Sequence, residues 1–222
     1  SQEYPIERVA SHYLRWISSA PFDVGNATRM AMDCNRQGQT PVHLQMRANA
    51  LAHNRDSKAN GALMRSSPLG IWSVRLNERE TVEAALSDAG LTHPNLTCQW
   101  ANAAYVSALR YLMLFPGDAS GAYQAALRAL PEDQSASAGS IEVSTWLEDA
   151  QAGRLPSCHP MAGFVRIGVT HAILHLLEES TFENGLRETR AGGGDTDTNA
   201  CIVGALVGAL HGIDGIPTSL VE

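Results

Sequence analysis

A run of three glycines followed by two closely spaced aspartates constrains this chain more than any other feature. Residues 192–194 are all glycine, residues 195–199 read Asp-Thr-Asp-Thr-Asn, and residues 200–212 form an apolar run with glycine at every fourth position from Gly204. Glycine lets the backbone turn tightly and lets other groups approach closely. The segment therefore predicts a sharp turn that places two carboxylates and two hydroxyl groups at the start of a helix.

Two interpretations of this group of oxygen atoms are open. An aspartate at a helix start accepts hydrogen bonds from unpaired backbone N–H groups and is favoured by the helix dipole. Asp195 alone would meet that requirement, and Asp197 exceeds it. Carboxylate, hydroxyl and water oxygens are also the ligands that Mg²⁺ takes in proteins. The spacing predicts either a doubly capped turn or a site for a hard cation.

Helical periodicity recurs along the chain and predicts an all-α protein with a single domain. Apolar residues repeat at three- and four-residue steps, and no stretch shows the alternation of a half-buried strand. A length of 222 residues is enough to bury a substantial core. Residues 132–140 are polar and small, and we expect a mobile loop there. The expected helices cover residues 6–17, 41–54, 78–90, 101–112, 119–130, 143–150, 164–178 and 200–212, with others after residue 26 and between residue 181 and the glycines.

Three helix starts carry recognisable capping residues. Thr40-Pro41 is typical of an N-cap followed by proline at the first helical position. Asn77 with Glu80 is typical of a capping pair, and Ser180 with Glu183 fits a capping box.

Composition limits the partners and the compartment. A formal net charge of −7 argues against nucleic acid, because binding phosphates requires clustered Lys and Arg. The longest apolar run, residues 200–210, is too short to span a bilayer, and the polar first residues do not resemble a signal peptide. The four cysteines are scattered, which is typical of reduced thiols. We expect a cytoplasmic protein that binds neither nucleic acid nor membrane.

Other polar segments suit a site less specifically. The loop at residues 57–61 is small, contains glycine and leads into a helix, so its N–H groups could bind an anion, although ordinary interhelical loops have the same composition. His93 lies in a predicted turn, where a histidine is usually a surface residue. His171 and His175 share a helix face, but no acidic ligand can be placed with them. We interpret this pair as packing or groove residues and not as a zinc site.

The glycine-aspartate segment resembles a known family. Gly-Gly-Asp-Thr-Asp-Thr-Asn-Ala, followed by Gly-Ala-Leu-x-Gly-Ala-x-x-Gly, is similar to the C-terminal signature of the ADP-ribosylglycohydrolases of the dinitrogenase-reductase-activating type. The resemblance implies a compact orthogonal all-α domain over residues 1–222. It also implies that Asp195, Asp197 and Thr198 are ligands of a two-ion Mg²⁺ site, in which Mn²⁺ can substitute. Asp195 and Asp197 are the implied catalytic residues, since either could orient or deprotonate a water molecule.

Three more segments resemble the same family in the same order. They are Trp16-Ile17 with Pro21-x-Asp23-Val24-Gly25-Asn26, the Asn-Gly-x-x-Met-Arg motif at residues 60–65, and Thr92-His93. The resemblance implies that these segments lie along a bound ADP-ribose. The implied ligand contacts are Gly25, Asn26, Ser57, Asn60, Gly61 and His93.

The implied activity is hydrolysis of the N-glycosidic bond that joins ADP-ribose to a protein side chain, with arginine as the acceptor that the family favours. An ADP-ribosylated protein would then be the substrate. The alternative is a non-catalytic module that binds ADP-ribose or a partner protein, such as an inhibitor of an ADP-ribosyltransferase. The sequence does not define the acceptor residue, the target protein or the oligomeric state.

The chain departs from the family in one respect. Members usually carry an early Gly-Asp-Ala-x-Gly segment and a later Thr-Asp-Asp-Thr, which supply the other half of the metal shell, and neither occurs here. The resemblance covers about the C-terminal two thirds of a usual member. Two expectations are open: a portion of a longer or cleaved enzyme, or a form that has lost half of the metal site.

Overall fold

The structure, a computed structural model, describes residues 3–35, 39–131 and 136–221. Within these residues the fold is all-α, as predicted, and the one β-type contact is an isolated bridge between Ala59 and Phe164. The elements are α1 (Ile6–Ile17), α2 (Asn26–Ala31), α3 (Val42–His53), η1 (Leu63–Arg65), α4 (Ser67–Trp72), η2 (Ser73–Arg75), α5 (Glu78–Ala89), α6 (Leu96–Leu114), α7 (Ala119–Arg128), α8 (Ala138–Gln151), α9 (Val165–Leu177), α10 (Phe182–Ala191), α11 (Thr196–His211), η3 (Ile213–Gly215) and η4 (Thr218–Leu220).

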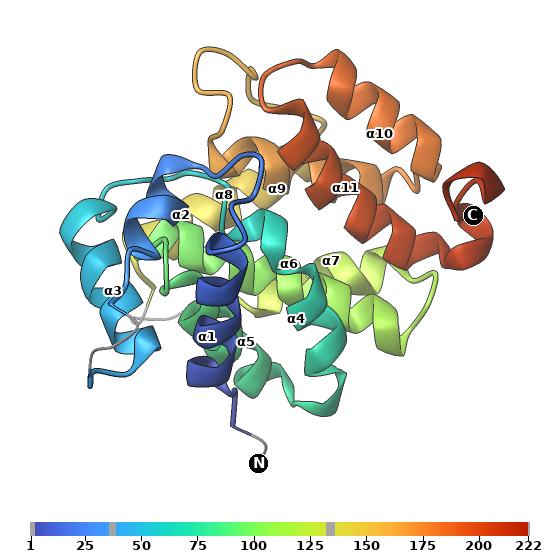
Figure 1. The fold of residues 1–222 in the computed structure, drawn as a ribbon. Coiled ribbons are helices and arrows are strands. Elements are labelled where there is room, and N and C mark those ends of the chain that lie inside the picture. Colours follow the sequence, from blue (N-terminus) through green and yellow to red (C-terminus); the bar gives the residue numbers. More distant parts are fainter. Residues whose placement is uncertain (1–2, 36–38, 132–135, 222) are drawn as a thin grey trace.

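The central helix is α6, which is buried along most of its length (Figure 1). Its apolar side chains join those of α7, α8, α9 and α11 in the main core. The hydroxyl of Tyr105 on α6 donates to the carbonyl of Ile202 on α11 at 2.7 Å, and both residues are fully buried. This bond satisfies a buried tyrosine and fixes the helix that begins at the two aspartates.

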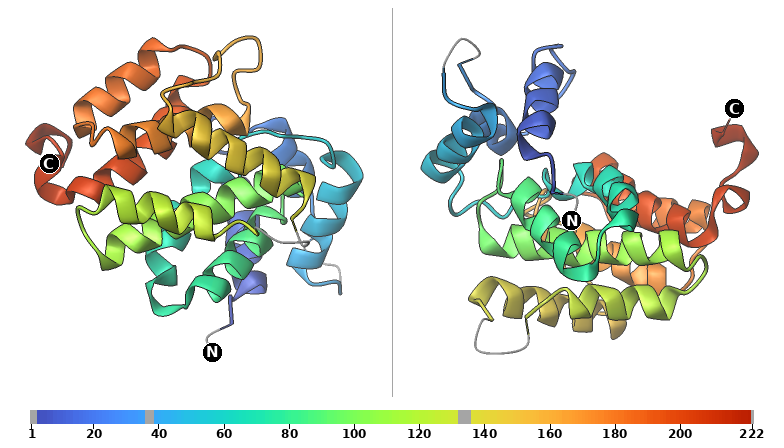
Figure 2. Two further views of the ribbon diagram at one scale, coloured as in Figure 1. Left: turned by 180° about the vertical axis from the view of Figure 1, so that it is seen from behind. Right: turned by 90° about the horizontal axis from the view of Figure 1, so that it is seen from below.

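The first three helices form a smaller group with its own apolar cluster. Figure 2 shows α1–α3 on one side of the helical body and α8 on the other. Ala10, Leu14, Met32 and Met46 pack together with Leu91, which follows α5. The helix expected after residue 26 forms as α2, which buries Thr28 and Ala31. The cleft between this group and the other helices is lined by segments far apart in sequence, from α1 to α11.

Long-range contacts set some helix boundaries differently from the local signals. The predicted cap at Thr40 is wrong, because α3 has no side-chain cap of its own and the Glu7 carboxylate accepts from the N–H groups of Val42 and His43, both at 3.0 Å. By contrast, the capping pair of Asn77 and Glu80 is confirmed.

Two later helices also begin at residues other than those predicted. A capping box between Ser137 and Ser140 starts α8 five residues before residue 143. The mobile loop expected over residues 132–140 is thus partly helical, and residues 132–135 lie outside the described part. The cap of α10 is Thr181 and not Ser180, whose hydroxyl instead lies 3.0 Å from His175 Nδ1.

The glycines around α11 serve close packing. A side chain at Gly204 would lie 3.1 Å from Leu186, and one at Gly168 on α9 would lie 2.7 Å from Ile202. Gly193 and Gly194 have φ values of +77° and +72°, as the predicted sharp turn requires. The turn also packs closely against the segment before α9, since a Cβ at Gly194 would lie 2.8 Å from the carbonyl oxygen of Cys158.

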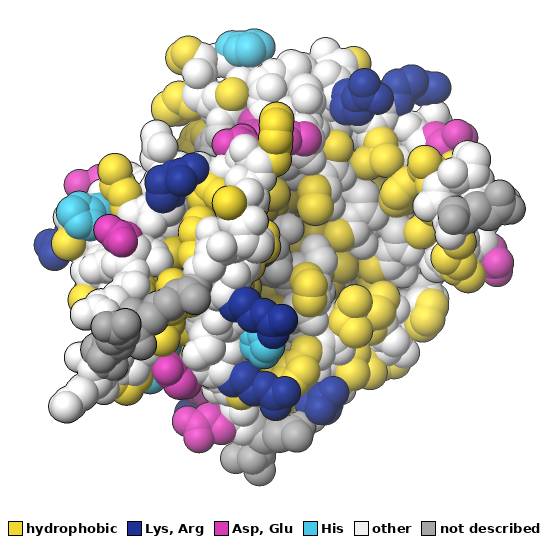
Figure 3. Space-filling view, in the orientation of Figure 1, with side chains coloured by type: hydrophobic (Ala, Val, Ile, Leu, Met, Phe, Trp, Pro, Cys, Tyr) yellow, Lys and Arg dark blue, Asp and Glu magenta, His cyan; other side chains and the backbone are white. Residues whose placement is uncertain are grey.

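The surface and the cysteines bear on the predicted partners. On the face in Figure 3, Lys and Arg side chains stand in separate groups, with apolar and acidic side chains between them. All four cysteines are free. Among the described residues, no helix combines the length and the apolar character needed to cross a bilayer.

We predict that Gly194→Ala destabilises the fold by about 2–4 kcal/mol, because it adds a steric conflict with Cys158 to the backbone strain of a positive φ. The matched control is Gly117→Ala, where φ is +81° but no atom lies within 4 Å of the added Cβ. That change should cost about 1–2 kcal/mol. Urea unfolding measures both, and equal losses would contradict the predicted contact.

Candidate active site

A cleft of about 560 Å³ lies between the α1–α2 segment and the start of α11. Its wall from the helical body comes from the loop before η1, the turn after α5 and the first turn of α11. The residues that line it are Tyr13, Trp16, Asp23, Val24, Gly25, Asn26, Ala27, Thr28, Met32, Ala59, Asn60, Gly61, Met64, Arg65, His93, Asp195, Asp197 and Thr198. The cleft brings together all the predicted site residues except Ser57.

Asp195 is the N-cap residue of α11, yet its carboxylate accepts no capping hydrogen bond from that helix. Its Oδ2 atom instead accepts from Asn60 Nδ2 at 2.9 Å. Asp197 Oδ1 accepts from the Thr198 N–H at 2.8 Å, while the residue remains exposed in the cleft. Capping therefore does not account for Asp195.

The two carboxylates are in contact with each other. A hydrogen bond between the two carboxyl groups lowers the pKa of Asp197, and the hydrogen bond from the Thr198 N–H acts in the same direction. Thr198 adds a hydroxyl whose contact in the protein is a long one, 3.9 Å to the sulfur of Met64. Two adjacent carboxylates and a weakly engaged hydroxyl form an all-oxygen donor set, which fits a hard divalent cation.

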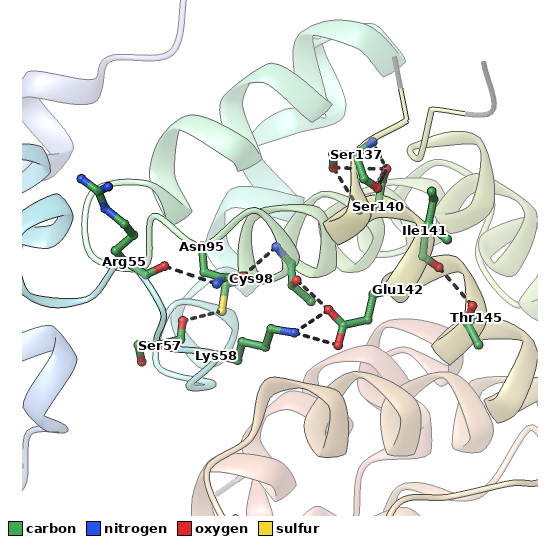
Figure 4. A network of polar contacts seen from close by, with 11 residues as sticks. Arg55, Ser57, Lys58, Asn95, Cys98, Ser137, Ser140, Ile141, Glu142 and Thr145 are labelled. Carbon is green, nitrogen blue, oxygen red and sulfur yellow. Dashed lines mark hydrogen bonds and ion pairs between the residues drawn. The ribbon is translucent and has the colours of Figure 1, made fainter. Parts of the chain in front are cut away.

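The loop that carries Asn60 is anchored to α6 and α8 by a network of polar contacts (Figure 4). Lys58 Nζ lies 2.8 Å and 2.6 Å from the two carboxylate oxygens of Glu142 on α8. Thr97 of α6 donates to the same carboxylate at 2.8 Å, and Cys98 Sγ donates to the carbonyls of Ser57 and Ala59. Each anchor lies on a core helix, so the loop takes its position from the core.

The backbone of the same loop is paired with the segment before α9. The Asn60 N–H donates to the Gly163 carbonyl at 2.9 Å, and the Val165 N–H donates to the Lys58 carbonyl at 2.8 Å. These bonds hold the Asn60 side chain, which is 5% exposed, against both Asp195 and Asn199.

His93 closes the floor of the cleft and is only 1% exposed. Its Nδ1 atom lies 2.8 Å from Thr92 Oγ1, and its Nε2 atom has no hydrogen-bond partner in the protein. Burial lowers the pKa of His93 to about 3, and the nearby Arg65 charge acts in the same direction. The ring is therefore neutral at physiological pH. His93 is thus buried, although a histidine in a turn is usually a surface residue.

Gly61 allows the ring of His93 to approach the loop. A Cβ at this position would lie 3.2 Å from His93 Cε1 and 3.0 Å from Thr28 Oγ1. Thr28 comes from α2, so three segments meet at this glycine. A side chain here would force the two cleft walls apart.

The opposite wall, formed by α1 and the segment around the start of α2, contains two residues that were not among the predicted contacts, Trp16 and Asp23. Gly25 and Asn26 are exposed at the start of α2, as a ligand-facing loop requires, and Asp23 and the half-exposed Trp16 lie beside them. Trp16 and Asp23 belong to the segment that carried the family resemblance. That resemblance is the signal that could have identified them.

Ser57 and the histidines of α9 lie away from the cleft lining. Ser57 contributes its carbonyl to Cys98, and its N–H donates to Asn54. His175 is buried, and its ring lies near the carboxylates of Glu178 and of Glu188 on α10, with one ligand atom from each within 4.8 Å of the others. Glu178 and Glu188 are thus the acidic neighbours of His175 that could not be placed from the sequence.

The fold and the oxygen-rich cleft define an all-α protein with a candidate cation-dependent site, and the comparisons identify its family. A model of the ADP-ribosylglycohydrolase family matches residues 1–222. The chain is 30% identical over 221 residues to a protein of Acanthamoeba polyphaga mimivirus named "Putative ADP-ribosyl glycohydrolase". That match covers 94% of this chain and 64% of the viral protein, so the chain spans a little under two thirds of its relative. The chain belongs to the ADP-ribosylglycohydrolase family, which is generally metal-dependent.

We predict that stability falls as the pH drops from 7 to 5. Burial holds the pKa of His93 near 3, and burial with the neighbouring His175 lowers that of His171 to about 4. Between pH 6.5 and these values only the unfolded chain takes up protons on these groups, so each lowers stability by up to roughly 1.4 kcal/mol per pH unit. Urea unfolding at both pH values measures the loss.

The variant that tests this cause is His171→Gln, which should make the loss between pH 7 and pH 5 smaller. The control is His53→Gln at the exposed end of α3, which should leave the loss unchanged. An identical pH dependence in all three proteins would show that the buried rings are not responsible.

Proposed function

We propose that this chain is a Mg²⁺-dependent ADP-ribosyl hydrolase that releases ADP-ribose from modified protein side chains by cleaving an N-glycosidic bond. One observation carries the proposal: the two carboxylates at the start of α11 share one cleft with the Asn60 loop and His93. The cleft volume falls in the range of roughly 300–1,000 Å³ that is usual for small-molecule sites. Family membership supports the class of reaction.

Asp195, Asp197 and Thr198 are the residues that would hold the metal. A bound divalent ion polarises substrate oxygens and makes a bound water more acidic. Asn60 fixes the Asp195 carboxylate through a hydrogen bond of 2.9 Å, and the adjacent Asp197 carboxylate is exposed in the cleft, where it would orient water.

The transition state requires a well-oriented ribose. Cleavage of a glycosidic bond develops positive, oxocarbenium-like charge at the anomeric carbon of the ribose. A bound cation would take up the charge of Asp195 and Asp197, so their proposed role is to hold the metal and to orient water. Asn60, Gly61 and His93 would position the ADP-ribose from the floor of the cleft, and Gly25 and Asn26 from the opposite wall. Ser57 lies outside the lining of the cleft, so we do not propose it as a contact.

Arginine is the proposed acceptor, and the rim of the cleft supports this choice. Asp23 places an exposed carboxylate on the wall opposite the Asp195–Asp197 pair. A cationic guanidinium suits a carboxylate, which can accept two parallel N–H bonds from it. The cytoplasm remains the proposed compartment, in keeping with four free cysteines.

The test is release of free ADP-ribose from an ADP-ribosyl-arginine peptide in the presence of Mg²⁺. We predict that Asp197→Asn lowers kcat at least about 100-fold, the low end of the effect of removing a positioned acid–base group. Chelation of the metal should abolish release, and added Mn²⁺ should restore it. The matched control is Asp214→Asn, which changes an exposed aspartate in η3 outside the cleft and should retain full activity.

Two other results are informative. ADP-ribose binding without release would favour the non-catalytic alternative, a module that binds ADP-ribose or a partner such as an ADP-ribosyltransferase. Neither binding nor release would contradict the assignment of the cleft.

A further inference from the structure

A buried polar network lies directly behind His93 and ends at its ring. Arg65 donates from Nη1 to Thr92 Oγ1 at 2.7 Å and from Nη2 to the Asp88 carbonyl at 3.0 Å. The same Nη2 atom lies 3.4 Å from the Asp88 carboxylate, and Asp88 is 2% exposed. The hydroxyls of Tyr4 and Tyr13 donate to the other oxygen of that carboxylate at 2.8 Å and 2.9 Å.

These contacts fix the orientation of the guanidinium. Nη1 also donates to the Gly61 carbonyl at 3.2 Å, and the centre of the Tyr13 ring lies 4.9 Å from the guanidinium carbon. Burial alone would lower the pKa of Arg65, but the Asp88 carboxylate beside it raises the pKa overall. Arg65 is therefore a permanent and immobile donor toward Thr92.

The direction of the next hydrogen bond follows from proton counting. Arginine carries donors and no acceptor, so Thr92 Oγ1 accepts from Arg65. The Thr92 hydroxyl is fully buried, and among the described residues its only other hydrogen-bonding neighbour is His93 Nδ1, 2.8 Å away, so its single hydrogen points to Nδ1. In a neutral imidazole one nitrogen accepts and the other carries the proton. With Nδ1 accepting, the proton of His93 is on Nε2.

We propose that Arg65 and Thr92 are positioning residues that fix the Nε2–H tautomer of His93, so that the cleft presents one ring N–H to an acceptor oxygen of the ligand. Nε2 has no partner in the protein, and its side of the ring faces Gly61, where an added Cβ would lie 3.4 Å from it. His93 and Gly61 both line the cleft. The inference rests on the proposed function and extends it.

The tautomer determines what His93 can do. An Nε2–H donor matches a hydroxyl or phosphate oxygen, and both occur in ADP-ribose. Because Nε2 of His93 carries the proton, this nitrogen cannot accept a hydrogen bond from the ligand. Nor is it the acid that protonates a leaving group, because the buried ring beside Arg65 stays neutral. His93 is thus a fixed donor for binding, and the relay behind it sets the polarity.

The first test reads the tautomer directly. In the ¹⁵N-labelled protein, two-bond ¹H–¹⁵N correlations show which ring nitrogen carries the proton, and loss of the signals in His93→Gln assigns them. We expect Nε2–H in the unmodified chain. A proton on Nδ1 would overturn the proposal, and this measurement requires neither turnover nor a relay variant that folds. It therefore remains interpretable if the hydrolase assignment fails.

The second test removes the relay. Thr92→Val keeps the shape of the side chain but removes its hydroxyl, and Thr92→Ser restores a hydroxyl. We expect Thr92→Val to lose the single Nε2–H tautomer and to weaken ADP-ribose binding about tenfold, raising KM more than it lowers kcat. Thr92→Ser should recover both properties. An unchanged tautomer and affinity in a folded Thr92→Val protein would overturn the proposal.

Discussion

The candidate site depends on one hydrogen bond between segments 135 residues apart, from Asn60 Nδ2 to Asp195 Oδ2. It joins the loop before η1 to the first turn of α11, and Asn60 is itself held by its backbone bond to Gly163. The Lys58–Glu142 pair and the Cys98 contacts connect the same loop to α6 and α8. The position of the carboxylate is consequently determined by the core and not by the flexible glycine turn alone.

A second polar network fixes α1 against the floor of the cleft. Asp88 joins the two tyrosines at and before α1 to Arg65, and Arg65 joins them to Thr92 and His93. Buried polar groups are costly when a partner is lost, so the hydrogen bonds of this network favour one arrangement of the surrounding segments. The two networks meet at Gly61, whose carbonyl accepts from Arg65 and whose neighbour Asn60 contacts Asp195. The metal-type ligands and the buried histidine are in this way held in one rigid frame.

Local signals in the sequence predicted the elements that depend on local chemistry. The bounds of α1 and the capping box of α5 agree with the structure, because periodicity and capping act within a few residues. The start of α3 was predicted to within one residue, but its cap was not, because the capping carboxylate belongs to Glu7, 35 residues earlier. The grouping of the predicted site residues came from the family resemblance, whereas spacing alone left capping and cation binding open. The Asp88–Arg65–Thr92 relay has no local pattern, since its members meet only after folding.

The most direct test of the account is an anomalous difference map from crystals soaked with Mn²⁺ and ADP-ribose, since manganese scatters anomalously and ADP-ribose is the proposed product. The account predicts a manganese peak against Asp195 and Asp197, with ADP-ribose along Asn60 and Gly61 and an oxygen facing His93 Nε2. A Glu188→Gln crystal separates this site from the cluster of His175, Glu178 and Glu188. Manganese only at that cluster, or a cleft that binds neither manganese nor ADP-ribose, would contradict the account.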